Sequence, residues 1–307
     1  MMTVTVSGTL ELSDLLTFAI GTCALITLWR PADEHRYHFS YPLVPIVLFS
    51  VATVWAWLFE LIDWLGILAI IGMALSAFAL RSSNTSPGGR FVSGLVLLIF
   101  SVAVFRGHLP GFNPVLLFDD LQLSSESRPF SLTLSYGYLV IGFMIVLSCN
   151  GLLRSRETWT RCMTLALPYI GATIAIVLLL QLLLGQIRFD PKLSMEIAIW
   201  AWANMFFFCF AEQALLRSLI QSRIQKWLSP YRVGPLSAVL LTAVVAAAVS
   251  FTGQWKTALV SGVAAAGIGW VYRRTMSIEM AIMAQFLLNM AHILLFTYPG
   301  PVTTGSA

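Results

Sequence analysis

Residues 163–185, MTLALPYIGATIAIVLLLQLLLG, decide the class of fold, because these 23 residues include no Asp, Glu, Lys or Arg. A transmembrane α-helix needs about 20 consecutive, predominantly apolar residues to cross a hydrocarbon core roughly 30 Å thick. This stretch meets that requirement without help from its neighbours. It therefore predicts a helix that spans a lipid bilayer.

Similar apolar runs follow one another along the whole chain. They cover residues 13–29, 42–60, 64–81, 91–106, 134–152, 163–185, 195–220, 235–251, 256–272 and 279–297. The run from Tyr41 to Leu80 is too long for one span and is interrupted by Glu60 and Asp63, which indicates a tight hairpin of two helices. We expect an all-α fold, a polytopic membrane bundle of about ten transmembrane helices.

The composition excludes a soluble domain and a nucleic-acid-binding protein. Hydrophobic residues make up 58% of the chain and charged residues 10%, whereas soluble domains carry about 25% charged residues. The net charge of +4 comes from basic residues spread thinly over loops, not gathered into a patch that would bind nucleic acid. The partner that the composition implies is the lipid bilayer.

The distribution of Lys and Arg predicts the orientation. With ten spans, alternate loops hold thirteen of the 18 basic residues: Arg30, Arg36, Arg81, Arg90, Arg154, Arg156, Arg161, Arg217, Arg223, Lys226, Arg232, Arg273 and Arg274. The opposite side holds Arg106, Arg128, Arg188, Lys192 and Lys256. Cytoplasmic loops are enriched in Lys and Arg, so we expect both termini outside the cytoplasm. A bacterial cytoplasmic membrane is the expected location, and the first helix, which no basic residue precedes, is expected to remain uncleaved.

The most unusual polar residue at membrane depth is Glu212, in the run Phe206-Phe207-Phe208-Cys209-Phe210-Ala211-Glu212-Gln213. Ionisable groups inside a bilayer cost about 2.5–3.5 kcal/mol each on insertion scales and mark functional sites by default. Asn204 lies on roughly the same helix face, and Arg217 follows near the cytoplasmic end, where it can snorkel or turn back towards Glu212. A structural Glu–Arg pair that clamps helices is the competing interpretation.

The last apolar run carries a second polar feature, the stripe Gln285, Asn289 and His292 at positions i, i+4 and i+7. Such a stripe faces the interior of a helix bundle, where interhelical hydrogen bonds explain it without any function. We expect Asn204, Glu212, Gln285, Asn289 and His292 to line one binding cavity.

Two other patterns favour structure over chemistry. Ala258, Gly262 and Ala266 recur at four-residue steps, with Gly267 and Gly269 behind them, and small residues at that spacing let helix backbones approach closely. Glu34, His35 and His38 lie in a short loop, and histidines in such a loop are more often solvated than bound to metal. No metal site and no cofactor is expected.

Glu212 and the last helices together resemble the CPBP family of intramembrane proteases, named for CAAX proteases and bacteriocin-processing enzymes. The family motif Glu-Glu-x-x-x-Arg corresponds here to Glu212-Gln213-Ala214-Leu215-Leu216-Arg217, and His-x-x-x-Asn corresponds to Gln285-Phe286-Leu287-Leu288-Asn289. The runs Gly267–Thr275, Asn289–Pro299 and His108–Asn113 are also similar to family segments. The resemblance is strongest over about 195–300 and extends weakly back to about 107, and we expect a CPBP-like membrane core over 161–307. The apolar runs predict membrane helices over residues 1–160, with a 107–133 loop that lies at the membrane interface, caps the helix bundle or is simply solvated.

The departures from the family pattern bear on activity. The resemblance implies that Glu212, Arg217 and Asn289 are retained catalytic positions, whereas the second glutamate is replaced by Gln213 and the last-helix histidine by Gln285. The middle histidine falls on Ser250 or, in the other register, on Trp255, and His292 is a poor substitute. Glutamine can hydrogen-bond but cannot shuttle a proton.

Three functions remain open at this point. The first is a catalytically impaired CPBP relative that binds a membrane-embedded peptide or protein partner. The second is an active CPBP intramembrane endopeptidase that uses Glu212 and Asn289 in an altered arrangement. The third, a transporter or channel component, is the weakest, because the sequence shows neither an internal repeat nor paired broken helices.

Overall fold

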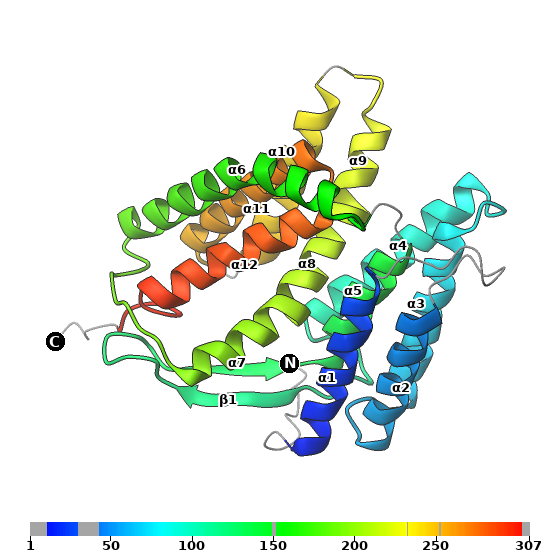
Figure 1. Cartoon of the computed structure of the whole chain (residues 1–307), viewed down its shortest axis with the longest axis horizontal. Coiled ribbons are helices and arrows are strands. Elements are labelled where there is room, and N and C mark those ends of the chain that lie inside the picture. Colours follow the sequence, from blue (N-terminus) through cyan, green and yellow to red (C-terminus); the bar gives the residue numbers. More distant parts are fainter. Residues whose placement is uncertain (1–10, 30–42, 149–151, 232, 252, 303–307) are drawn as a thin grey trace. The chain divides into compact units, whose positions relative to one another are not determined.

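The computed structural model describes residues 11–29, 43–148, 152–231, 233–251 and 253–302, which are mostly helical (Figure 1). The chain divides into two compact units. Unit 1 comprises Met1–Phe118, Leu132–Arg154 and Phe206–Leu215, and unit 2 comprises Asp119–Ser131, Ser155–Met205 and Leu216–Ala307. The expected boundary at residue 160 stays a prediction.

The described residues form ten helices, if the continuous helix Met195–Trp227 is counted once. Unit 1 holds α1 Leu12–Thr27, α2 Leu43–Leu58, α3 Trp64–Arg81, α4 Pro87–Phe105, α5 Tyr136–Ser148 and α8 Phe210–Gln213. Unit 2 holds α6 Arg156–Leu183, α7 Met195–Ala203, α9 Ser222–Trp227, α10 Gly234–Ser250, α11 Trp255–Thr275 and α12 Ile278–Leu295. Every apolar run predicted from the sequence coincides with one of these ten helices.

Short polar residues fix where several helices begin. The Asp63 carboxylate accepts hydrogen bonds from the backbone N–H groups of Leu65 (2.7 Å) and Gly66 (3.1 Å) at the start of α3. Ser86 precedes Pro87 and caps α4, and Ser277 caps α12 through Met280 N (3.1 Å). These side chains satisfy backbone donors that the first helical turn leaves unpaired.

Five helices are long and apolar enough to cross a membrane: α3, α4, α6, the continuous helix Met195–Trp227 and α12. α1, α2, α5 and α10 are apolar but have only 13–17 residues in the described part of the chain. At 1.5 Å per residue, a 16-residue helix reaches about 24 Å, less than the roughly 30 Å hydrocarbon core. Five helices of the described chain thus have the length and composition of membrane spans, and the full set of ten spans stays a prediction.

The interior of unit 1 is aromatic. Phe49 and Phe143 stack with ring centroids 4.2 Å apart and an angle of 8° between the planes. Phe18 meets Phe207 edge to face at 5.2 Å. Tyr136 is fully buried among these rings, and its hydroxyl lies 2.9 Å from the Thr53 hydroxyl. Packing of large apolar surfaces therefore holds α1, α2, α5 and the 206–215 segment together.

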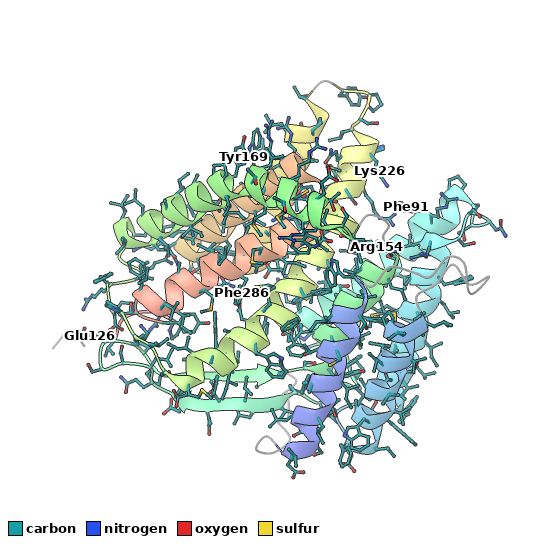
Figure 2. All side chains as sticks on the ribbon, in the orientation of Figure 1. Phe91, Glu126, Arg154, Tyr169, Lys226 and Phe286 are labelled. Carbon is teal, nitrogen blue, oxygen red and sulfur yellow. The ribbon has the colours of Figure 1, made fainter. Side chains whose placement is uncertain are left out.

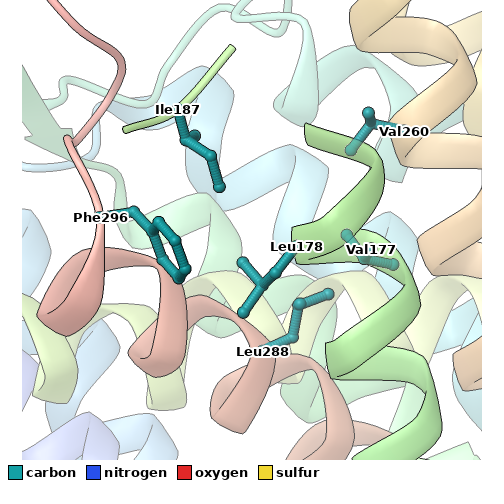
Figure 3. Packing of buried hydrophobic residues seen from close by; sticks show 6 residues of the cluster. All are labelled: Val177, Leu178, Ile187, Val260, Leu288 and Phe296. Atoms are coloured by element: carbon teal, nitrogen blue, oxygen red, sulfur yellow. The ribbon is translucent and has the colours of Figure 1, made fainter. Parts of the chain in front are cut away.

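The interior of unit 2 brings α6, α11 and α12 side by side (Figure 3). Val177, Leu178, Ile187, Val260, Leu288 and Phe296 form one buried apolar cluster there. A Cβ at Gly267 would lie 2.5 Å from the Thr173 side chain, and one at Gly262 would lie 3.2 Å from Ala247 Cβ. Close packing through the small residues of α11 is thus confirmed.

The expected all-α fold was wrong in one segment, because residues 115–134 form a two-stranded β-hairpin that takes up most of the 107–133 loop. Its strands are β1 Val115–Leu121 and β2 Phe130–Leu134. The sequence Phe130-Ser131-Leu132-Thr133-Leu134 alternates apolar and polar residues, a signal typical of a half-buried strand. The length and polarity of the loop had masked this short alternation.

Within unit 2, the half-buried Asp190 holds the tip of the hairpin. Asp190 accepts hydrogen bonds from the Ser124 hydroxyl and from the Ser127 hydroxyl (3.1 Å), and it pairs with Lys192 Nζ at 3.0 Å. Burial alone would raise the pKa of Asp190, but the hydrogen bonds from these two hydroxyls and from Lys192 hold that pKa below its usual value. Ser124 and Ser127 are therefore held by Asp190, whereas Ser125 and Glu126 between them are exposed. Whether the loop as a whole is interfacial or solvated stays a prediction.

Candidate functional site

The long helix Met195–Trp227 is widened on both sides of Glu212. The π-helical segment η1 Asn204–Cys209 precedes the single α-turn α8, and η2 Ala214–Gln221 follows it. π-helical turns are rare and occur frequently at functional sites. Both the charge of Glu212 in the sequence and the π-helical backbone on either side of it therefore point to the same candidate site.

Glu212 and Gln213 lie in the part of this helix that belongs to unit 1, where α8 packs on α5. A Cβ at Gly142 of α5 would meet the Phe210 ring at 2.6 Å and the Ala211 Cα at 3.6 Å, so the two backbones approach closely. Glu212 is half-buried and Gln213 is buried. The aromatic run around them is used for packing, since Phe208 contacts Tyr138 with ring centroids 4.9 Å apart.

Arg217 belongs to unit 2 and is fully buried. Its guanidinium donates one hydrogen bond to Gln221 Oε1 (2.8 Å) and another to the backbone oxygen of Ala265 on α11 (3.0 Å). Of the two placements expected for Arg217, snorkelling to the membrane surface was wrong, because the side chain is fully buried. A rigid fork of N–H donors suits two acceptors on different elements, which ties η2 to α11.

Gln221 is a site residue that the sequence did not single out. Its side chain is fully buried, and Nε2 donates to the backbone oxygen of Gly269 at 3.0 Å. A Cβ at Gly269 would lie 2.9 Å from Arg217 Nη1 and 3.1 Å from Gln221 Oε1, so the glycine leaves room for both side chains. The only sequence signal was its place one helical turn after Arg217, on the same face.

Asn204 and Asn289 come together inside unit 2. Asn289 Nδ2 on α12 donates to Asn204 Oδ1 at 3.1 Å, in the zone where α12 packs on α7. Asn204 is buried and Asn289 is half-buried. Gln285, also half-buried, lies one turn before Asn289, so both amides occupy the same face of α12.

The comparisons with known proteins bear on this same region. Residues 194–291 match the family model described as Type II CAAX prenyl endopeptidase Rce1-like. We call these residues the Rce1-like domain, because they are similar to that family of CAAX prenyl endopeptidases. No curated protein and no solved structure matches the chain at a significant level.

Within the Rce1-like domain, the two positions at which the middle histidine of the family could fall lie at helix ends. Ser250 is the last residue of α10 and is half-buried, and Trp255 is the first residue of α11 with 60% of its surface exposed. His292, just beyond the domain, places Nε2 3.3 Å from the Thr297 oxygen and its ring 5.4 Å from Tyr298. The contacts of this histidine are thus with the residues that directly follow α12.

The shared cavity of Asn204, Glu212, Gln285, Asn289 and His292 stays a prediction, because Glu212 belongs to unit 1 and the other four residues to unit 2. No group of three or more His, Cys, Asp or Glu residues that could hold a metal ion occurs in the described part of the chain. Glu34, His35 and His38 lie outside the described residues.

Proposed function

We propose that the Rce1-like domain binds a membrane-embedded peptide or protein segment and does not cleave it. The observation that carries this proposal is the hydrogen bond between Asn289 and Asn204, in which two side-chain amides meet on facing helices. An amide offers both donors and an acceptor, the groups that recognise a peptide backbone in a medium without water. It cannot take up or release a proton near neutral pH.

The replaced family positions support binding over cleavage. Gln213 and Gln285 stand where the family carries a glutamate and a histidine, and neither Ser250 nor Trp255 titrates near neutral pH. Peptide hydrolysis requires proton transfer from water and to the leaving amine, and each positioned acid or base contributes about 10²–10⁴-fold in rate. Among these family motif positions, Glu212 is the one that still offers an acid or base for proton transfer.

The test is a cleavage and binding assay on the purified full-length protein. Farnesylated CAAX peptides and single-span membrane peptides, each with a photoreactive group, are offered to wild type and to Glu212→Ala. We expect no cleavage by either protein, and crosslinking that is lost in Asn289→Leu but kept in a surface control, Phe91→Ala. Phe91 lies on α4, outside the Rce1-like domain (Figure 2).

The second candidate, an active endopeptidase, has a specific observation in its favour: π-helical segments flank Glu212. Cleavage by wild type that is abolished in Glu212→Ala would establish it and refute the proposal. If wild type is inactive, the combined variant Gln213→Glu, Gln285→His and Ser250→His, or the same with Trp255→His, tests whether the missing acid–base groups are the cause.

We also propose that both termini lie outside the cytoplasm of a bacterial-type membrane, with ten spans. The support is the split of thirteen basic residues against five. Reporter fusions at Arg90, Arg156 and Arg274 should all report the cytoplasm. An opposite signal at any two of these positions contradicts the ten-span topology.

A further inference from the structure

Unit 1 contains an open pocket at the turn between α2 and α3, with a volume of about 630 Å³. It is lined by Trp57, Leu58, Glu60, Ile62, Asp63, Trp64 and Asn113. The family resemblance assigns no role to these residues. The pocket also lies outside the segment that matches the Rce1-like family.

The floor of the pocket is fixed by residues 111–113. Asn113 donates through Nδ2 to the Glu60 backbone oxygen (2.6 Å) and through its backbone N–H to the Leu61 oxygen (2.9 Å). The Asp63 N–H donates to the Gly111 oxygen at 3.1 Å. These bonds hold Glu60 at φ 60°, a left-handed conformation that a non-glycine residue adopts only when its surroundings stabilise it. The turn is thus preformed and keeps Glu60 in the wall of the pocket.

The lining has the chemistry of a cation site. Among the described lining residues, the ionisable side chains are the carboxylates of Glu60 and Asp63, and residues 43–80 contain no Lys or Arg. The residues Trp57 and Trp64 are 52% and 65% exposed. Tryptophan is the strongest aromatic partner of ammonium ions, especially alkylated ones. An aromatic and acidic pocket favours an organic ammonium group over an anion.

The surfaces next to the pocket favour a lipid as the source of that ammonium group. Exposed apolar side chains run in rows along both helices at steps of four, three and four residues: Val47, Val51, Val54 and Leu58 on α2, and Trp64, Leu68, Ile71 and Leu75 on α3. The first row ends at the pocket and the second begins there. Acyl chains can lie along such rows while the headgroup stays at the helix ends, where Trp side chains mark the membrane interface.

We propose that this pocket binds the ammonium headgroup of a zwitterionic phospholipid, with its ammonium at Glu60 and against Trp57 and Trp64, and its acyl chains along α2 and α3. The acidic lining disfavours anionic lipids, because their headgroups meet like charge. The inference does not depend on the proposed function of the Rce1-like domain.

The experiment is native mass spectrometry of the full-length, delipidated protein titrated with dioleoyl phosphatidylethanolamine or dioleoyl phosphatidylglycerol. Wild type should bind the ethanolamine lipid more tightly. Glu60→Gln should raise its dissociation constant about tenfold, as expected for loss of a hydrogen bond to a charged group. Trp57→Leu and Trp64→Leu should each raise it about fivefold. None of the three variants should change binding of phosphatidylglycerol by a similar factor.

Two controls match these variants outside the pocket: Glu157→Gln, an exposed acid at the start of α6, and Trp227→Leu, an indole 77% exposed. Both controls should bind the two lipids like wild type. Thermal melting identifies any pocket variant that fails to fold, and the other pocket variants then test the proposal. Equal affinity of wild type for the two lipids, or unchanged affinity in folded Glu60→Gln, overturns the proposal. So does equally tight binding of glycerophosphoethanolamine, which carries the headgroup without acyl chains.

Discussion

The two units of this protein solve the packing of membrane helices in different ways. Unit 1 packs aromatic rings against one another, and Phe49, Phe143 and Phe18 occupy its interior. Unit 2 buries Arg217 and Gln221 and directs them to backbone oxygens of α11. Apolar packing needs only complementary shape, whereas each buried polar group in a bilayer needs a specific partner. Most of the Rce1-like domain lies in unit 2, the unit that contains the buried Arg217 and Gln221.

The comparison predicts that unit 2 loses most stability when a polar side chain is removed. Arg217→Leu should lower the free energy of unfolding by about 4 kcal/mol, because two hydrogen bonds from a charged donor are lost at about 2 kcal/mol each. Thermal or denaturant unfolding in detergent measures the change. Arg156→Leu, at an exposed arginine of α6 in the same unit, should have little effect, and a loss below about 1 kcal/mol for Arg217→Leu would show that the network is not structural.

Unit 1 should instead be most sensitive to loss of an aromatic ring. Phe143→Ala removes a buried side chain that stacks on Phe49, and large-to-small changes of this kind cost about 3 kcal/mol or more. The same unfolding measurement applies, with Phe91→Ala as the control because Phe91 is 70% exposed. If both substitutions had equal effects, the aromatic core would not be what holds unit 1 together.

A smaller and pH-dependent effect is expected at Asp190, the acid that holds the hairpin tip within unit 2. Asp190→Asn breaks the pair with Lys192 and should cost about 2 kcal/mol at pH 7, less than the 3–5 kcal/mol found for fully buried pairs. Because the pKa of Asp190 is lowered in the fold, its stabilisation is fully present above the ordinary aspartate pKa of about 4 and is lost as pH falls through the lower folded-state value.

Melting temperatures of wild type and Asp190→Asn should therefore differ at pH 7 and converge towards pH 3. Asp119→Asn, an exposed acid of β1 that accepts a hydrogen bond from Ser131 (3.3 Å), is the matched control. A difference that stays constant between pH 7 and pH 3 would mean that the pair with Lys192 does not stabilise the fold.

The sequence predicted the helices well because their signal is local. Each apolar run coincides with a helix, and Asp63 and Ser86 stand where a cap is needed. The β-hairpin was missed because five alternating residues give a weak signal inside a long polar segment. Gln221 and the pair Asp190 and Lys192 were missed for another reason: their partners, Gly269 on α11 and Ser124 and Ser127 at the hairpin tip, lie 48 and about 65 residues away.

The sequence by itself therefore determined the apolar, membrane-type character of the helices, their positions and the similarity of residues 194–291 to Rce1-like endopeptidases, because hydropathy and motif spacing are properties of neighbouring residues. Only the tertiary structure decided that Arg217 is buried against α11, that Asn289 meets Asn204, and that Glu60, Trp57 and Trp64 share a pocket. These facts depend on which helix faces bury their polar groups together. A sequence pattern identifies a polar residue in an apolar helix, but it does not predict which distant atom is its hydrogen-bond partner.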